Sequence, residues 1–211
     1  MYPRNGVFVI VLSLITLVSA EPNQISTDVE RAQMLEARLA AREKVYPPAS
    51  DVLLMEYSNE LEVLADYWAS QCRFEHPDWQ QYPQFEGTGQ NIAAISSFKP
   101  PFSEAACGWR GEAKYHSYFN DSCSYVCGHY TQMVWANSSL LGCAMRQCDY
   151  MRPDWDNPQY FTVCQYKPAG LTTTDWTGYT CSAVLGVEHH VSYPSFCAHF
   201  SCFVYQATLC C

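Results

Sequence analysis

Twelve cysteines are the reactive side chains that stand out in this 211-residue chain, and all of them lie beyond residue 20. An even number of cysteines in an exported chain predicts a disulfide framework. Two close pairs, Cys123 with Cys127 and Cys143 with Cys148, also have spacings that structural zinc sites use. We expect disulfides here, because the start of the chain indicates export to an oxidising compartment.

Nucleophilic catalysis has little support in the sequence. A serine triad needs a nucleophile, a base and an orienting acid in one geometry. The chain contains no G-x-S-x-G stretch or comparable nucleophile motif. We therefore expect no catalytic residues and keep hydrolysis as the weakest of three candidate functions.

Residues 1–20 resemble a secretory signal peptide. Arg4 is followed by an uncharged, mostly apolar run over 7–18, and the run ends at small residues up to Ala20. Twelve apolar residues are too few to span a hydrocarbon core of ~30 Å. We therefore predict a secreted, extracellular protein that does not span the membrane.

Net charge argues against polyanionic partners. The full chain carries −9, and removal of Arg4 with the signal would make this −10. A chain this acidic is not suited to hold nucleic acid or anionic headgroups by charge. The balance favours a neutral ligand and excludes nucleic acid as an expected partner.

Helix signals are clear in three places. Thr27 and Glu30 form a capping-box pattern, after which Val29, Leu35 and Leu39 recur near helical spacing until Pro47 ends the segment. A second helix with an apolar stripe is predicted to begin after Ser58, which would be its N-cap. A third is predicted to begin after Ser103 and to reach about Tyr118.

Two segments near the end of the main domain read as paired strands, residues 140–146 and 160–166. The turn at 167–170 then closes the domain. Residues 171–211 hold five cysteines and 1–170 hold seven, so full pairing within the chain requires an odd number of bridges between the two parts. The competing interpretation is an intermolecular bridge, and the protein would be a monomer or a dimer accordingly.

Several ordered motifs resemble those of the CAP superfamily, which groups cysteine-rich secretory proteins, venom antigen 5 and plant pathogenesis-related 1. They include the two signature stretches at 128–143 and 161–170. The other matches are Arg42–Ala49, Trp68–Cys72, Gly89–Ile92, Trp109–Glu112 and His129–Gln132. The resemblance implies an α+β fold, a three-layer α-β-α sandwich over 21–170. Residues 171–211 would be a short disulfide-rich C-terminal extension packed on it, and the venom-allergen-like branch of parasitic helminths is the most similar.

The resemblance also implies a cleft built on two His and two Glu, which in several relatives bind a divalent metal. The second Glu matches Glu112 and the second His matches His129, which we expect to be hydrogen-bonded to each other. The first Glu position is Gln90, and the first His position falls on Arg38. We expect Arg38 to pair with Glu112 across the cleft. Because this tetrad is incomplete, we expect no Zn or Mg cofactor.

Sterol binding is the stronger function that the resemblance implies, through a displaced aromatic loop. Aromatic side chains offer flat apolar area while their polar edges stay wet. The resemblance points to the loop that leads into His129, whereas an aromatic-x4-aromatic-x2-aromatic pattern points to an earlier loop. The two candidate sets are Tyr115, Tyr118, Phe119 and Tyr125 in the first case and Phe74, Trp79 and Tyr82 in the second.

Relatives with a fatty-acid channel between helices suggest Leu35, Leu39 and Ala106 as a possible lining. Asn120 and Asn137 are possible glycosylation acceptors in N-x-S sequons. The function that we expect is extracellular binding of a sterol or other lipid, at a host or tissue interface. The alternative is an interaction scaffold for a host receptor or matrix protein.

Overall fold

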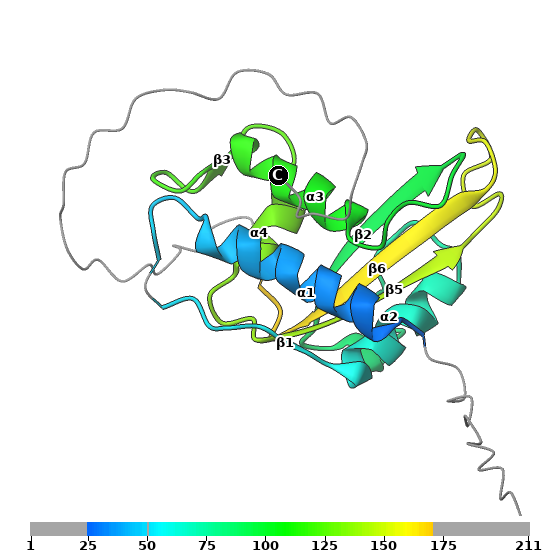
Figure 1. Cartoon of the computed structure of the whole chain (residues 1–211), viewed down its shortest axis with the longest axis horizontal. Helices are drawn as coiled ribbons and strands as arrows, with labels where there is room; N and C mark the ends of the chain where they lie inside the picture. Colours follow the sequence, from blue (N-terminus) through cyan, green and yellow to red (C-terminus); the bar gives the residue numbers. More distant parts are fainter. Residues whose placement is uncertain (1–24, 50, 171–211) are drawn as a thin grey trace, which may run out of the picture.

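A four-stranded sheet lies between two helical layers in the computed structural model (Figure 1), which describes residues 25–49 and 51–170. The predicted signal peptide and the extension 171–211 lie outside the described residues. The strand order is β1-β5-β6-β2, with β1 parallel to β5 and the other neighbours antiparallel. The strands are β1 Glu56–Tyr57, β2 Gly89–Ser96, β5 Leu140–Gln147 and β6 Gln159–Lys167.

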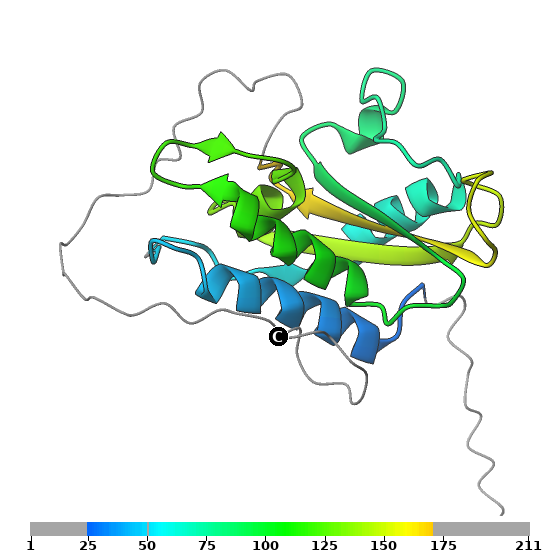
Figure 2. The same cartoon turned by 90° about the horizontal axis from the view of Figure 1, so that it is seen from above.

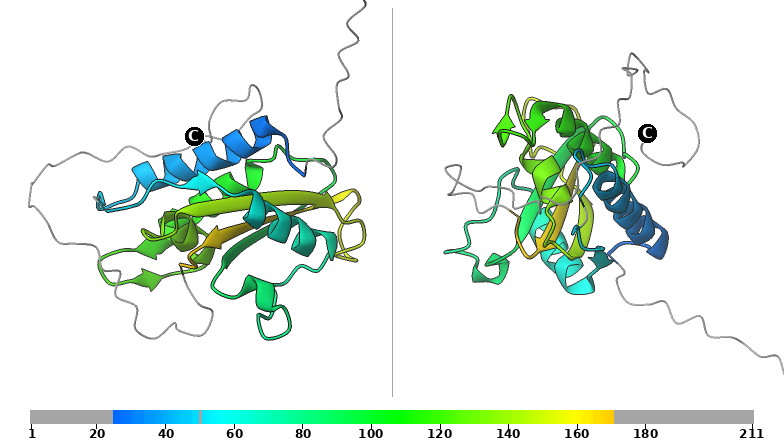
Figure 3. Two further views of the ribbon diagram at one scale, coloured as in Figure 1. Left: turned by 90° about the horizontal axis from the view of Figure 1, so that it is seen from below. Right: turned by 90° about the vertical axis from the view of Figure 1, so that its left-hand side faces the viewer.

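One helical layer contains α1 Asp28–Glu43, α3 Glu104–Arg110 and α4 Gly128–Val134, while α2 Asn59–Ser70 packs on β5 and β6 from the other side. Figure 2 shows α1 and α3 side by side, and Figure 3 shows α1 and α2 on opposite sides of the sheet. The predicted three-layer α-β-α sandwich is therefore confirmed. Two short 3-10 helices, Pro83–Phe85 and Gly111–Tyr115, and a hairpin of β3 His116–Ser117 with β4 Ser122–Cys123 complete the described elements.

Strand β6 separates two cores because neighbouring side chains in a strand point to opposite faces. Cys164 and Tyr166 lie in the core beneath α1, α3 and α4. Phe161 and Val163 lie in the core beneath α2. This near-continuous burial explains why β6 was recognisable as a strand.

Helix α1 begins where the sequence predicts, with the Thr27–Glu30 capping box formed in both directions. Its expected apolar face is wrong at the start, since Val29 is 66% exposed. The buried face instead carries Arg38 and Arg42. Two buried arginines count as polar in any hydrophobic pattern, and the pattern was therefore read one step out of phase.

Helix α2 starts after Ser58, whose side chain caps it as predicted. The helix approaches β5 closely at Gly142, where a Cβ would lie 2.1 Å from the backbone nitrogen of Glu62. Only glycine allows this approach. The helical layer beneath the sheet thus depends on a residue with no side chain.

The third helix is shorter than predicted. It ends at Arg110, and the chain then passes through a 3-10 turn to the β3–β4 hairpin before Tyr118. Strands β5 and β6 agree with the prediction, but β2 was not predicted. Its first residues, Gly89, Gln90 and Asn91, have low strand propensity, and pairing with β6 decides their structure.

Three disulfides join described residues: Cys72–Cys148, Cys123–Cys127 and Cys143–Cys164. Cys107 is disulfide-bonded as well. These bonds confirm disulfides over zinc for all four close cysteines, although Cys143 and Cys148 are bonded to Cys164 and Cys72 and not to each other. The expected odd number of bridges to 171–211 concerns cysteines outside the described residues.

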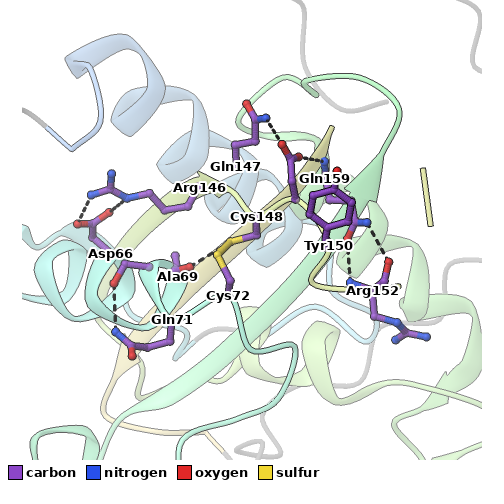
Figure 4. The surroundings of a disulfide bond; sticks show 12 residues. Asp66, Ala69, Gln71, Cys72, Arg146, Gln147, Cys148, Tyr150, Arg152 and Gln159 are labelled. Atoms are coloured by element: carbon purple, nitrogen blue, oxygen red, sulfur yellow. Dashed lines mark hydrogen bonds and ion pairs between the residues drawn. A yellow bond between two sulfur atoms is a disulfide. The ribbon is translucent and has the colours of Figure 1, made fainter. Parts of the chain in front are cut away.

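Figure 4 shows the Cys72–Cys148 bond, which ties the end of α2 to the loop after β5. Beside it, Asp66 and Arg146 form a two-contact ion pair at 2.6 Å.

None of the helices in the described part of the chain has the length and apolar content needed to cross a bilayer.

Candidate binding cleft

His129 and Glu112 form the best-defined polar contact of the cleft. His129 stands in the first turn of α4, and its Nδ1 lies 2.6 Å from Oε1 of Glu112. The other carboxylate oxygen accepts the backbone N–H groups of His129 and Tyr130, at 3.1 and 3.2 Å. Because an ionised carboxylate only accepts hydrogen bonds, Nδ1 of His129 carries a proton and donates it to Glu112. The expected His129–Glu112 contact is formed.

Arg38 is not a cleft residue, which corrects the expectation that it pairs with Glu112. Its guanidinium is fully buried, and Nε donates to the Tyr166 hydroxyl at 2.7 Å while Nη2 lies 3.3 Å from Sγ of Cys164. The expected partner, Glu112, is instead bonded to His129 and Tyr130 of α4. The buried face of α1 thus carries Arg38 into the core beneath the cleft.

Trp109 connects this buried cation with the cleft. The guanidinium of Arg38 lies 4.8 Å from the indole ring centroid, and the same indole stacks on the His129 ring at 5.8 Å. A cation over an indole face is an attractive contact, stronger where water is excluded. Arg38 therefore supports the position of His129 through Trp109 and does not face the ligand space.

A second imidazole, His76, lies in the cleft and was missed by the sequence analysis. Its Nδ1 is 2.8 Å from Oε1 of Gln90, and both residues line the same pocket as His129. Burial of its ring lowers the pKa of His76, the bond to Gln90 opposes this, and the charge of His129 adds to it. The sequence feature that could have identified His76 as a cleft residue is its place in the loop between Cys72 and Gln90.

These residues do not fit a divalent metal site. Both oxygens of Glu112 already accept hydrogen bonds from α4, and the position opposite His76 offers a neutral amide in place of a carboxylate. Within the described residues, no group of three or more His, Cys, Asp or Glu side chains is placed to hold a metal ion. The donor set is two imidazoles, a neutral amide and one carboxylate already bonded to α4, which is weak for Zn²⁺.

The cleft opens into a pocket of about 1380 Å³ that runs around the ends of β2 and β6. Among the described residues that line it, none is Lys or Arg. A smaller pocket of about 340 Å³ adjoins it and contains Lys44. The aromatic side chains that line the large pocket are Tyr46, Trp79, Phe85, Tyr118, Tyr125, Tyr130 and Trp135.

The aromatic side chains of the loop that leads into His129 lie together beside the large pocket. Tyr115 and Tyr125 pack edge to face at 5.3 Å, and Tyr118 contacts Phe119 at 6.0 Å. Tyr46, from the end of α1, joins them through an edge contact with Phe119. Tyr46 was not among the predicted residues, although its Tyr-Pro-Pro context marks the turn that exposes it.

The first aromatic pattern is divided by the fold. Phe74 packs on Phe161 at 5.8 Å but stays 39% exposed, whereas Tyr82 packs on Trp68 at 5.3 Å at the edge of the core beneath α2. Only Trp79 of this set lines the large pocket, and it is 53% exposed. The spacing of the pattern therefore does not correspond to one surface.

Leu35, Leu39 and Ala106 pack in the core between α1 and α3 and line neither of the two pockets. Asn120 and Asn137 are both exposed, as a glycosylation acceptor must be. Asn137 also lies at the rim of the large pocket.

Residues 30–166 match the model of the CAP family, described as the cysteine-rich secretory protein family. This chain belongs to the CAP family. Two relatives are GLIPR1-like protein 1 of Homo sapiens, 41% identical over 64% of this chain, and Glioma pathogenesis-related protein 1 of Mus musculus, 38% identical over 67% of this chain. The matched segments span 57% and 54% of those relatives, so this CAP chain covers little more than half of their length.

Solved CAP structures share the fold. The crystal structure of NaASP2 with Zn²⁺ is 27% identical, with a TM-score of 0.57 over 71% of this chain and 84% of that one. Venom allergen-like protein 4 of Schistosoma mansoni is 22% identical, with a TM-score of 0.56 over 68% of this chain and 90% of that one. The second likeness supports the sandwich architecture of the CAP domain.

Proposed function

We propose that this CAP protein binds a neutral lipid outside the cell, with sterols as the ligand class. The observation that carries the proposal is the large pocket with Tyr46, Tyr118 and Tyr125 at its mouth. Ligand pockets are mostly apolar, with a few polar groups that fix orientation. This pocket has that composition and is large enough for a four-ring ligand.

Exposure of the aromatic loop supports the proposal. Phe119 is 77% exposed and Tyr125 is 76% exposed, and Tyr46, which contacts Phe119, is 76% exposed as well. Contiguous exposed apolar area commonly marks an interaction site. A sterol would cover these rings and remove their apolar area from water.

Charge in the pocket favours a neutral ligand over a fatty acid. The lining contains Asp51, Glu86 and Asp121 but no Lys or Arg among the described residues. A carboxylate would therefore enter the pocket without a counter-ion. Together with the core packing of Leu35, Leu39 and Ala106, this leaves the fatty-acid channel out of the proposal.

The extracellular setting is supported by family membership and by disulfides in every pair of cysteines that the described residues contain. Such bonds persist in oxidising compartments. We place the lipid-binding role at an extracellular or host interface, and glycosylation of Asn120 and Asn137 fits that setting.

An interaction scaffold is the second candidate, because the same exposed rings would fit an apolar protein surface. A host receptor or matrix protein would then cover Tyr46, Phe119 and Tyr125.

A hydrolase remains the weakest candidate. All seven described cysteines are disulfide-bonded, so His129 has no free thiol among the described residues to activate as a nucleophile.

The test is saturable binding of radiolabelled cholesterol to the purified mature protein, with and without EDTA. We expect binding that survives EDTA and is lost in a triple variant, Tyr118→Ala, Phe119→Ala and Tyr125→Ala. Phe98→Ala with Tyr150→Ala is the matched control, because these rings are also exposed but do not line the pocket. Absence of saturable binding in the wild-type protein would refute the sterol proposal, and binding of a protein partner without lipid would favour the scaffold.

A further inference from the structure

Two glutamine amides at the floor of the large pocket have unpartnered polar atoms. Gln90 on β2 and Gln165 on β6 are paired directly opposite each other in the antiparallel ladder. Their side chains share one face of the sheet and lie about 5 Å apart at Cβ. Both residues line the pocket, and both Nε2 atoms are buried without a hydrogen-bond partner.

Gln165 is the more unusual of the two because its side chain is fully buried. Its Oε1 lies 3.3 Å from Oγ1 of Thr88, but that hydroxyl also donates to the Phe85 carbonyl at 2.7 Å. A threonine hydroxyl has a single hydrogen, and the shorter bond uses it. The Gln165 oxygen thus has one long contact and its Nε2 has none, and an unpartnered buried polar group costs about 1–3 kcal/mol.

Buried polar groups without partners are rare in folded domains and call for an explanation. The unpartnered atoms are two amide nitrogens, which a ligand atom that accepts hydrogen bonds would satisfy. A hydroxyl oxygen has two lone pairs and can accept from both, whereas an ammonium only donates. The acidic residues of the lining and the lack of Lys or Arg there disfavour a carboxylate.

We infer that Gln90 and Gln165 form a subsite for an uncharged hydroxyl, and that this subsite binds the 3-hydroxyl of a sterol whose rings lie toward the aromatic mouth. The inference rests on the proposed function and deepens it, because it assigns the residues that determine specificity for a free sterol. Aromatic contacts at Tyr118 and Tyr125 supply affinity, and the two amides read the hydroxyl.

The experiment compares cholesterol with 5-cholestene, which has the same ring system without the hydroxyl, for binding to the wild-type protein. One or two hydrogen bonds correspond to a preference of about five- to thirtyfold for cholesterol. Gln165→Met and, separately, Gln90→Met should remove this preference and leave binding of cholestene unchanged. Gln71→Met is the matched control, because Gln71 is exposed and lies outside the pocket lining.

Gln165→Met is expected to fold, because the only partner of the lost amide, the Thr88 hydroxyl, keeps its hydrogen bond to the Phe85 carbonyl. Thermal unfolding of each variant checks this directly. Equal binding of both ligands by the wild-type protein would overturn the hydroxyl subsite while leaving lipid binding intact. A preference retained in both variants would also overturn it, and binding of neither ligand by the wild-type protein would refute the proposed function and the inference together.

Discussion

Glu112 accepts three hydrogen bonds from the first turn of α4, and the shortest comes from Nδ1 of His129 at 2.6 Å. The carboxylate therefore acts as a helix cap that also fixes the orientation of the imidazole. Its charge is favourably placed, because a helix N-terminus carries partial positive charge. The pair is a positioning device for the cleft.

We predict that Glu112→Gln lowers the free energy of unfolding by about 1–2 kcal/mol, because an amide nitrogen would face N–H donors in place of an acceptor oxygen. Urea unfolding measures the change. Glu36→Gln, at an exposed position in α1, is the control and should stay within about 0.5 kcal/mol of the wild-type protein. Equal values for both variants would show that the cap has no energetic role.

The two buried arginines of α1 should respond differently to replacement by methionine. Arg42 donates to four backbone carbonyls, those of Leu53, Met133, Trp135 and Ala136. Burial lowers the pKa of Arg42 to about 10, so it remains charged at neutral pH. Arg42→Met leaves these carbonyls without their donor and should cost about 3 kcal/mol or more.

Arg38→Met should cost less, within about 1 kcal/mol, because Nη1 of Arg38 already lacks a partner and its desolvation is relieved. The Tyr166 hydroxyl retains Asn91 as a donor at 3.2 Å. Chemical denaturation of both variants checks the contrast. A larger loss for Arg38→Met than for Arg42→Met would contradict it.

The disulfides should differ in their contribution to stability according to the loops that they close. Cys72 and Cys148 are 76 residues apart in sequence, whereas Cys123 and Cys127 are 4 apart. Loop-closure entropy predicts losses of about 4 and about 2 kcal/mol when each pair is replaced by serine. Thermal unfolding of the two double variants measures the difference, and the opposite order would contradict the entropic account.

Stability should fall at alkaline pH because of Tyr57. Burial is the main cause that raises the pKa of Tyr57, although the backbone N–H of Cys143, which donates to the Tyr57 oxygen at 3.1 Å, opposes the shift. The folded state thus keeps a proton that the unfolded chain releases near pH 10, so the contribution is fully present below about pH 10 and declines as the pH rises above it.

Urea unfolding at pH 8, 10 and 11 tests this, with Tyr57→Phe as the comparison. The variant should show a shallower decline, because one group that links folding to pH has been removed. Tyr130 and Tyr166 also have raised pKa values through burial, so some decline should remain. An unchanged slope in Tyr57→Phe would assign the decline to those residues.

Local signals in the sequence determined the elements whose residues act through near neighbours. Thr27 and Ser58 cap α1 and α2 because their side chains reach backbone groups three residues away. The aromatic and β-branched run of β6 identified a buried strand, and the even cysteine count identified disulfides. These features depend on contacts within one element or on the chemistry of a residue type.

Tertiary structure alone decided the rest. Strand β2 forms because it pairs with β6. Helix α1 buries two arginines because backbone carbonyls, a tyrosine hydroxyl and Trp109 on other elements contact their guanidinium groups. His76 lies in the cleft and Arg38 lies in the core because their hydrogen-bond partners, Gln90 and Tyr166, are there. A pattern read along the chain carries no information on which distant group will satisfy a polar side chain, and that partner determines whether the side chain is buried, exposed or aimed at a ligand.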